Sequence, residues 1–263
     1  MEKVMLIKEN FMKSYQSLGL EKGDNVIVHT SLSSLGYVCG GAQTIIESLL
    51  ETVGDSGTIL MPTQSWKNLS PESGVHYEVP EEYWQILKEN LPAYDKDITP
   101  TNTMGIVAEM FRTWKGTIRS DHPARSFSAN GANAKYLVEN HDLSDIFGKS
   151  SPIGKLYELD GKVLLIGVDY DKNTSLHLAD VLAEYPSKKN EIASSVVKIG
   201  GERQWIDYET LAVDGEDFVQ IGIDFERFNS IKKIGIGNAV VKCMNMRELV
   251  DFAISWIESN RKC

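Results

Sequence analysis

The sequence has very few cysteines and no long hydrophobic run. Its three cysteines, Cys39, Cys243 and Cys263, are odd in number and form no C-x-x-C pair, which excludes a disulfide framework and indicates free thiols in a reducing compartment. No apolar stretch approaches the length of about 18 residues that a membrane helix needs, and Met1–Leu20 carries Glu and Lys instead of a signal-peptide core. We therefore expect a soluble cytoplasmic protein with no membrane partner.

Basic residues are also in short supply. With 27 Lys and Arg against 37 Asp and Glu the net charge is −10, which argues against a nucleic-acid partner because phosphate binding requires a basic surface. The same charge is compatible with a cationic small molecule. No internal repeat or long linker divides the 263 residues, so we expect residues 1–263 to form a single domain.

Several familiar site patterns are missing as well. The sequence has no C-x-x-C or H-E-x-x-H spacing, so we expect no metal site. The absence of Gly-x-Ser-x-Gly argues against a serine hydrolase of the α/β-hydrolase kind. Neither the P-loop pattern nor Gly-x-Gly-x-x-Gly is present.

The N-terminal part of the chain predicts a strand–helix–strand unit. Asn25–His29 and Thr58–Met61 are short hydrophobic runs that indicate strands. Between them, apolar residues recur with helical spacing on one face: Ala42, Ile45, Ile46, Leu49, Leu50 and Val53. Such a unit makes its two strands parallel neighbours. A helix over Leu6–Leu18 precedes it, and residues 63–100 follow as an insertion without a clear long element.

The remaining elements complete a mixed fold. We expect a helix over Thr101–Trp114 with Thr101 or Thr103 as its cap, a central strand over Lys162–Val168, and a helix from about Thr174 to Tyr185.

The last part of the chain predicts a hairpin and a final helix. Ser194–Ile199 and Arg203–Tyr208 flank a Gly-Gly turn. The final helix begins at Asn245, with Glu248 completing a capping box. The fold class is therefore α/β (α+β mixed): a single domain around a central mixed β-sheet flanked by helices, with this antiparallel hairpin in addition.

The helix after the predicted central strand carries the first candidate for chemistry. At about 100° per residue, His177, Asp180 and Glu184 lie within about 60° of one another. A carboxylate one turn from a histidine can accept its Nδ1–H and raise the basicity of Nε2, as a general base requires. Thr174 and the free N–H groups of the first turn are placed to stabilise an oxyanion. From periodicity alone, a solvated polar stripe is the simpler explanation.

Two loop-like segments are also polar. His29–Gly36 (HTSLSSLG) offers hydroxyl and backbone N–H groups suited to a phosphate or a pantetheine-like chain, although a flexible connection explains it as well. Within Ser120–Phe127, His122 precedes a proline, which is more typical of a turn than of a catalytic base. His76 and His141 have no partner pattern, and we expect them on the surface.

Four segments, taken together, are more specific than any single motif. They occur in one order over most of the chain: HTSLSSLGYVCGGAQTIIESLLETVGDSGTILMPTQSW (29–66), PTNTMGIVAEMFR (100–112), SDHPARSFSANGANA (120–134) and SSPIGKLYELDGKVLLIGVDYDKNTSLHLAD (150–180). In these segments the chain resembles the aminoglycoside N3-acetyltransferase family, which acetylates antibiotics and is structurally distinct from GNAT acetyltransferases. The compact length resembles the Bacillus-type members most.

The resemblance implies an antibiotic-resistance enzyme that uses acetyl-CoA as co-substrate, without a metal. The acceptor would be the 3-amine of the 2-deoxystreptamine ring of an aminoglycoside. His177 matches the family's catalytic histidine, and Asp180 matches the carboxylate that supports it. The resemblance places CoA against three segments: His29, Thr30, Ser31, Leu32, Ser33, Ser34, Leu35, Thr103, Met104, Gly105, Ser126 and Phe127.

One position departs from the family pattern. The family usually has Glu where this chain has Asp180, and Asp is one methylene shorter. The hydrogen bond to His177 is therefore expected to be direct, water-bridged or absent, with Glu184 as the alternative partner.

The expected mechanism is direct attack of the amine on the thioester in a ternary complex, since no cysteine falls in the catalytic motif. We expect acidic and aromatic side chains to hold the polycationic acceptor, namely Glu81, Glu82, Tyr83, Trp84 and Glu184.

Two other functions remain open from the sequence. The first is a CoA-dependent acetyltransferase that acts on a different amine. The second is a CoA-binding protein in which Asp in place of Glu at position 180 impairs turnover. No helix shows a sustained heptad seam, so the oligomeric state, a homodimer included, also stays open.

Overall fold

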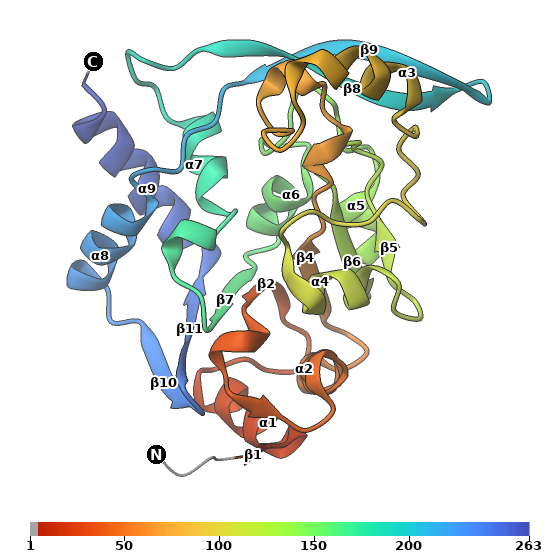
Figure 1. The fold of residues 1–263 in the computed structure, drawn as a ribbon. Coiled ribbons are helices and arrows are strands. Elements are labelled where there is room, and N and C mark those ends of the chain that lie inside the picture. The colour runs from red at the N-terminus through yellow and green to blue at the C-terminus, as the bar shows by residue number, and fades with distance from the viewer. Residues whose placement is uncertain (1–4, 263) are drawn as a thin grey trace.

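A seven-stranded mixed sheet runs through the computed structural model, which describes residues 5–262 (Figure 1). From one edge to the other, its strands are β10 (Lys232–Ile236), β11 (Ala239–Asn245), β7 (Lys162–Ile166), β2 (Asn25–Thr30), β4 (Thr58–Pro62), β6 (Phe127–Gly131) and β5 (Ile118–Arg119). The three central strands, β7, β2 and β4, are parallel, and the outer pairings are antiparallel. The expected mixed sheet and the central place of β7 are confirmed.

The predicted strand–helix–strand unit is confirmed. β2 and β4 flank α2 (Gly41–Val53) and pair in parallel, with Val26 opposite Ile59. The apolar stripe of α2 explains its place, because it is buried against the sheet at Ala42, Ile45, Ile46, Leu49 and Val53, while Leu50 is partly buried. One face of the sheet is therefore covered by this helix.

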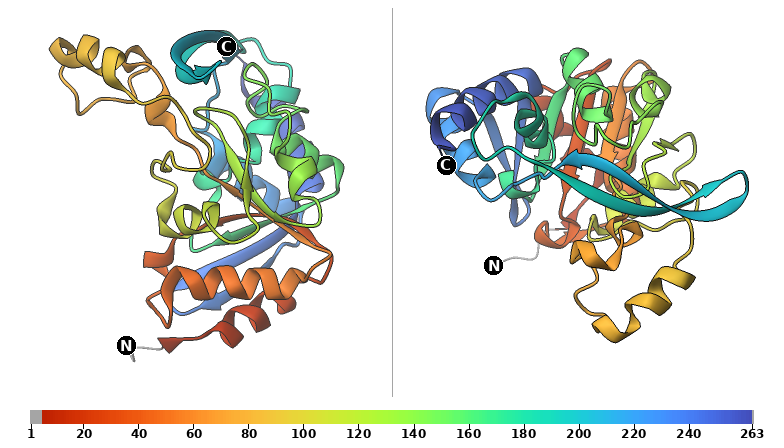
Figure 2. Two further views of the ribbon diagram at one scale, coloured as in Figure 1. Left: turned by 90° about the vertical axis from the view of Figure 1, so that its right-hand side faces the viewer. Right: turned by 90° about the horizontal axis from the view of Figure 1, so that it is seen from above.

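Alternating strand residues build two hydrophobic cores, one on each face of the sheet. Val26 and Val28 of β2 belong to the core under α1 (Lys8–Ser17), α2 and α4 (Gly105–Arg112), whereas Ile27 belongs to the opposite core. The helices of that opposite layer are α5 (Ala134–Val138), α6 (Pro152–Glu158), α7 (Leu176–Leu182), α8 (Phe218–Phe228) and α9 (Met246–Asn260). Figure 2 (left) shows the two helix layers on either side of the sheet.

The expected hairpin lies outside the central sheet. β8 (Asn190–Ile199) and β9 (Glu202–Leu211) pair antiparallel. Gly200 and Gly201 between them have φ angles of 59° and 90°, the left-handed conformation that a two-residue hairpin turn requires. The hairpin crosses one end of the molecule (Figures 1 and 2).

Residues 63–100 fold against this hairpin. They contain short 3-10 turns and one short helix, α3 (Trp84–Asn90). The backbone N–H of Ser70 donates to the carbonyl of Ser194 at 2.8 Å, and the indole of Trp205 donates to the carbonyl of Lys88 at 2.8 Å. The insertion is thus attached to the hairpin by hydrogen bonds to backbone carbonyls of both segments. At the other end of the molecule, β1 (Met5–Leu6) and β3 (Tyr37–Val38) form a short parallel pair.

α4 begins later than the sequence predicts, at Gly105 instead of Thr101. Neither Thr101 nor Thr103 caps it, because the residue before the helix is Met104, whose side chain makes no capping bond. Thr103 has a φ of 58° and Gly105 a φ of 84°, so the chain turns through the left-handed region just before the helix. Thr103–Gly105 is therefore a tight turn and not a helical one.

α7 is shorter at both ends than the predicted Thr174–Tyr185. At its C-terminal end, the ammonium group of Lys188 donates to the carbonyls of Val181 and Ala183, at 3.0 and 2.9 Å. These bonds satisfy acceptors that a longer helix would use internally, and Ala183 is extended. The final helix, in contrast, starts as predicted: the N–H of Glu248 donates to the side chain of Asn245 at 3.0 Å.

Candidate active site

His177 and Asp180 of α7 are in direct contact. Nδ1 of His177 lies 2.9 Å from Oδ2 of Asp180, one helical turn later. The carboxylate is fully buried, whereas the imidazole remains 19% exposed. Of the three arrangements that the sequence left open, the direct contact is the one observed, because the shorter Asp side chain reaches the ring. The carboxylate fixes Nδ1–H as a donor, which leaves Nε2 as the nitrogen free to accept a proton.

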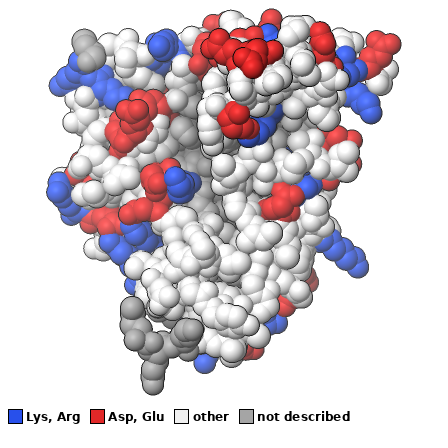
Figure 3. All heavy atoms as spheres, viewed as in Figure 1, with Lys and Arg blue, Asp and Glu red and all other residues white. Residues whose placement is uncertain are grey.

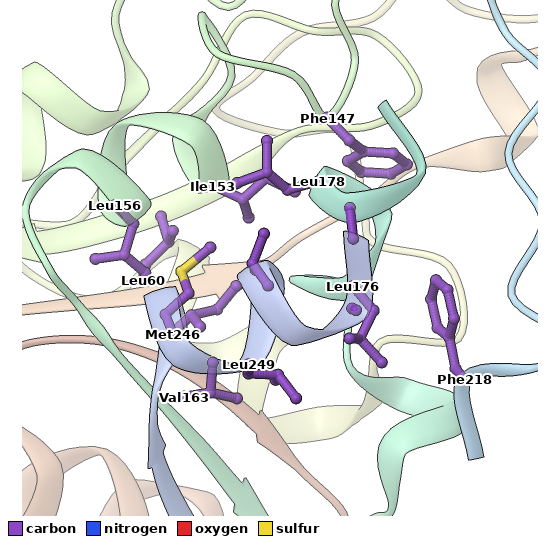
Figure 4. Close-up of a cluster of buried hydrophobic side chains, with 14 of the residues drawn as sticks. Leu60, Phe147, Ile153, Leu156, Val163, Leu176, Leu178, Phe218, Met246 and Leu249 are labelled. Carbon is purple, nitrogen blue, oxygen red and sulfur yellow. The ribbon is translucent and has the colours of Figure 1, made fainter. Parts of the chain in front are cut away.

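Two phenylalanines hold the imidazole ring of His177. Phe147 stacks on it with ring centres 4.7 Å apart and an interplanar angle of 10°, and Phe218 meets it edge-on, also at 4.7 Å. Both belong to the core under α7, and Figure 4 shows them at one end of that core, beside the segment that carries Leu176 and Leu178. The packing fixes the ring plane, so the direction of Nε2 is fixed as well.

Arg261, just after α9, contacts the other oxygen of the carboxylate. Its Nη1 donates to Oδ1 of Asp180 at 2.6 Å, and its Nε and Nη2 donate to the two carboxylate oxygens of Asp217, each at 2.7 Å. Burial lowers the pKa of Arg261, but the hydrogen bonds and charges of Asp217 and Asp180 outweigh it and raise that pKa above its usual value. The guanidinium therefore stays charged.

The loop before α8 runs along the exposed side of the base. A methyl group built on Gly215 would lie 3.7 Å from Cε1 of His177, so the backbone of this loop passes directly beside the ring. Asp214 and Glu216, on either side of the glycine, have exposed side chains. Two exposed carboxylates thus belong to the loop that passes beside the imidazole.

A cavity of about 540 Å³ opens at the carboxyl ends of the three parallel strands. This is where ligands bind in many open α/β sheets. Residues from β2, β4 and the segment after β7 meet there with the turn before α4. The expected CoA residues that line it are His29, Thr30, Ser31, Leu32, Ser33, Thr103, Met104 and Gly105.

Thr174 joins the cavity to the base. Thr174 lines the cavity, and its carbonyl accepts the backbone N–H of His177 at 3.1 Å. Lys172, at the end of a 3-10 turn over Tyr170–Lys172, lines the same cavity. Among the described residues that line the cavity, no other is a Lys, Arg, Asp or Glu.

The floor of the cavity contains polar atoms that the chain itself does not satisfy. Within the described residues, neither Nε2 of His29 nor Oγ1 of Thr30 has a hydrogen-bond partner, although both are buried. Burial lowers the pKa of His29 to about 3, so its imidazole is neutral. Buried polar atoms without partners are rare in proteins, and here they fit a ligand with polar groups of its own.

Four of the expected CoA residues do not line the cavity. Leu35 and Phe127 are buried in the two cores. The hydroxyl of Ser34 donates to the carbonyl of Ser31 at 2.8 Å, and that of Ser126 donates to the carbonyl of Thr63 at 2.9 Å. The expectation that these four side chains line the CoA channel is therefore wrong for this cavity, because the folded chain uses them for packing and internal hydrogen bonds.

The expected acceptor residues of the insertion lie outside this cavity. Glu81, Glu82 and Tyr83 are exposed on the turn that leads into α3, and the indole of Trp84 donates to the carbonyl of Val79 at 3.1 Å. Figure 3 shows acidic side chains gathered at this end of the molecule, above a region around α2 that carries few charges.

The expectation that Glu184 shares a helical face with His177 is wrong. α7 ends before Glu184, whose side chain is 86% exposed and pairs with Lys188 at 3.4 Å. Asp180 is therefore the carboxylate in contact with the imidazole.

The expected surface positions of two histidines are wrong too. His76 and His141 are buried, as is His122. Nδ1 of His122 accepts the backbone N–H groups of Ala124 and Arg125, at 3.2 and 3.0 Å, so this ring stabilises a turn, as its His-Pro sequence indicates.

Sequence reasoning missed Phe147, Phe218, Arg261 and Lys172. No local spacing links the first three to His177, and their signal lies only in the folded contacts. Of the cysteines, Cys39 is exposed and Cys243 is buried, both as free thiols, and Cys263 lies outside the described residues. Residues 5–262 contain no cluster of His, Cys, Asp and Glu arranged to hold a metal ion. No described helix is long and apolar enough to cross a membrane.

Comparison with known proteins extends this geometry. The family model for aminoglycoside 3-N-acetyltransferase matches residues 27–258. The chain is 39% identical to the SPbeta prophage-derived aminoglycoside N(3')-acetyltransferase-like protein YokD of Bacillus subtilis, over 96% of this chain and 93% of that protein. It is 34% identical to aminoglycoside N(3)-acetyltransferase IX of Micromonospora chalcea, over 93% and 91% of the two chains.

Solved structures agree with the fold. The crystal structure of YokD from Bacillus subtilis superposes with a TM-score of 0.93 at 37% identity, covering 98% of this chain and 95% of that one. The structure of AAC-IIIb in its binary complex with CoASH superposes with a TM-score of 0.87 at 28% identity, covering 98% of both chains.

Proposed function

Because the chain belongs to the aminoglycoside 3-N-acetyltransferase family and is an acyltransferase of that family, we propose that it transfers the acetyl group of acetyl-CoA to the 3-amine of the 2-deoxystreptamine ring of an aminoglycoside. His177 is the general base, and the reaction takes place in a ternary complex. The observation that carries this proposal is the imidazole of His177, held on one side by a buried carboxylate and open on the other, next to a cavity at the carboxyl ends of the parallel strands.

The cavity is suited to the donor. AAC-IIIb binds CoASH, and the same class of ligand fits the polar atoms of His29 and Thr30 that lack partners in this chain. Lys172 supplies a cation for the CoA phosphates, and the hydroxyl groups and backbone of Thr30–Ser33 supply hydrogen bonds to the pantetheine arm.

The chemical step follows from the position of the base. The nitrogen of the neutral acceptor amine attacks the thioester carbonyl carbon, and Nε2 of His177 takes one of its protons as the C–N bond forms. Thr174 and backbone N–H groups near it stabilise the oxyanion of the tetrahedral intermediate. The intermediate collapses as the C–S bond breaks, and the proton on His177 passes to the departing CoA sulfur. Asp180 stabilises the imidazolium while it exists.

No acyl-enzyme is needed in this sequence of steps. Cys39 and Cys243 do not line the cavity, and burial raises the pKa of Cys243 to about 11, which keeps it a thiol. Direct attack uses the proximity of the two substrates instead.

The acceptor side is supported by the exposed carboxylates of Asp214 and Glu216, which flank the glycine beside His177. A polycationic aminoglycoside presents ammonium groups that suit them. Glu81, Glu82, Tyr83 and Trp84 remain proposed as a second, more distant contact surface on the insertion, and Glu184 as an exposed acidic residue beyond α7.

The first prediction concerns His177. Replacement by Ala or Gln removes the base, and we expect kcat/KM for a cognate aminoglycoside to fall by about 10²- to 10⁴-fold, with the Kd for CoA unchanged because the ring is not part of the cavity wall. Thiol release from acetyl-CoA measures turnover, and calorimetry measures CoA binding. Wild-type turnover in His177→Ala would disprove the assignment of the base.

An amine panel tests the acceptor. Aminoglycosides with a free 3-amine, analogues in which that amine is blocked, and simple polyamines are compared in the thiol-release assay, and the acetylated nitrogen is identified by NMR. Turnover confined to a free 3-amine supports the proposal. Turnover on other amines alone would replace the acceptor, and CoA binding without turnover on any amine would replace the enzymatic function itself.

A further inference from the structure

Asp180 lies between a histidine and an arginine in a fully buried position. Its Oδ2 contacts Nδ1 of His177, and its Oδ1 accepts a hydrogen bond from Nη1 of Arg261. A buried carboxylate without a cation favours its neutral form, and a neutral carboxyl group cannot stabilise an imidazolium. The arginine is therefore the group that makes an anionic Asp180 tolerable in this position.

The orientation of Arg261 is fixed from the opposite side. Asp217 accepts two parallel hydrogen bonds from Nε and Nη2, and the carbonyl of Asp214 accepts a third at 3.2 Å. A two-point contact of this kind sets the plane of a guanidinium. With that plane set, Nη1 points at Asp180, and the ring of Tyr185 covers the guanidinium face at 5.1 Å.

The geometry assigns Arg261 as a positioning residue for the proposed reaction: its guanidinium compensates the buried charge of Asp180 and holds that carboxylate against His177. This inference rests on the proposed function, since it concerns the same base. The inference also connects α8 and α9 to the proposed base, because Asp217 directly precedes α8 and Arg261 directly follows α9.

Loss of the arginine has a defined electrostatic consequence. The ionisable groups around His177 and Asp180 are Arg261 from α9, Asp214 and Asp217 from the loop before α8, and Tyr185 after α7. Burial raises the pKa of Tyr185, so it stays neutral near pH 7. The ammonium of Lys188 lies nearby as well, on the carbonyls of Val181 and Ala183. Removing Arg261, the cation in contact with Asp180, makes the His177–Asp180 pair bind its proton more tightly, whichever atom carries it.

The test compares Arg261→Met with Arg247→Met. Arg247 is at the start of α9, where it is half exposed and lies 3.5 Å from Asp160, so its loss changes the net charge equally at the far end of the helix. In Arg261→Met we expect the acid limb of kcat/KM to move to higher pH by about one unit. We also expect kcat to fall about 10- to 100-fold with little change in KM for acetyl-CoA. Arg247→Met should match the wild type.

A second measurement does not depend on activity. The sequence has five histidines, and the ring resonance of His177 is identified by its absence in His177→Gln. Its titration by NMR in the unliganded enzyme should shift upward in Arg261→Met by the same amount as the acid limb.

Two further variants separate charge from shape. Arg261→Lys keeps the cation but loses the two-point contact, so the NMR titration should stay near the wild type while kcat falls. Asp217→Asn keeps the guanidinium but removes a nearby negative charge, so the titration should shift to lower pH. These two variants also carry the test if Arg261→Met does not fold.

A purely structural role for Arg261 predicts a different result. In that case all three variants lower the melting temperature and leave the titration of His177 and the acid limb where they are in the wild type, which would overturn the inference. If the wild type is active and the acid limb of kcat/KM is the same in Arg261→Met, this inference is refuted and the proposed function is not. A wild type without turnover on any amine refutes the proposed function, and the NMR titration still decides the electrostatic role of Arg261.

Discussion

Lys172 is a charged residue in the lining of the cavity. The ammonium of Lys172 also lies 3.0 Å from the carboxylate of Asp171. An ion pair between this exposed ammonium and a CoA phosphate contributes about 1 kcal/mol or less. We therefore expect Lys172→Met to raise the Kd for CoA about fivefold at low salt. The difference should shrink as salt screens the phosphates. Titration calorimetry at two ionic strengths measures both effects.

A matched control for this change is Lys198→Met, which removes the same charge from β8, away from the cavity. We expect its Kd for CoA to equal that of the wild type. An unchanged Kd in Lys172→Met at low salt would mean that the CoA phosphates bind elsewhere.

Single-residue contacts were predictable where the helical period alone decides them. The contact between His177 and Asp180 follows from a spacing of one turn. The same calculation fails for Glu184, because α7 ends before that residue is reached. Arg261 is separated from Asp180 by 81 positions, and no local pattern in the sequence connects two residues that far apart.

At the scale of elements, Lys188 caps the C-terminal end of α7. Its ammonium donates to two carbonyls at the end of the helix that carries His177 and Asp180. We expect Lys188→Met to lower the free energy of unfolding by about 1 kcal/mol, and the melting temperature by about 2–4 °C for a chain of this size. Lys189→Met is the matched control. Lys189 is the exposed neighbour of Lys188, so this change removes the same charge without removing the contact with α7. Equal melting temperatures of the two variants would contradict this role.

The elements that the sequence predicted well are those with a strong period of their own. β2, α2, β4 and β7 have long apolar patterns and were found with bounds close to the observed ones. β6 reads Phe-Ser-Ala-Asn-Gly and β5 has two residues. Such strands exist because a neighbour pairs with them, which is information that a single segment does not contain. The late start of α4 is also not visible in the segment itself, since the left-handed turn at Thr103–Gly105 packs beside β2 and lines the cavity.

For the whole molecule, buried histidines predict sensitivity to acid. Burial lowers the pKa of His29 to about 3 and that of His141 to about 4, and burial also holds the pKa of His122 well below its usual value. The unfolded chain binds protons at these rings below about pH 6.5, whereas the folded chain does not. Stability is therefore complete above about pH 6.5 and is lost as the pH falls toward 4. Each ring contributes a slope of up to about 1.4 kcal/mol per pH unit.

Urea unfolding between pH 7.5 and 5 measures this slope. It should be steep before the carboxylates begin to titrate, and His29→Asn should flatten it by about one ring's share, whatever that variant does to stability at pH 7.5. A free energy of unfolding that is constant between pH 6.5 and 5 would show that these rings are protonated in the folded protein.

The class of fold could be predicted because one strand–helix–strand unit and a set of ordered motifs both point to it, and the seven strands do share one sheet. The order of the strands could not, because β10 and β11 join the sheet next to β7 only after the chain has returned from the hairpin.

The clamped imidazole has a consequence for regiochemistry. With its plane set by Phe147 and Phe218 and its Nδ1 committed to Asp180, His177 offers one fixed point at which a proton can be removed. An aminoglycoside carries several amines of similar reactivity, so intrinsic nucleophilicity cannot choose among them. Under the proposed mechanism the choice depends on distance: we expect acetylation at the amine whose separation from the other ammonium groups matches the separation of Nε2 from the carboxylates proposed to bind them.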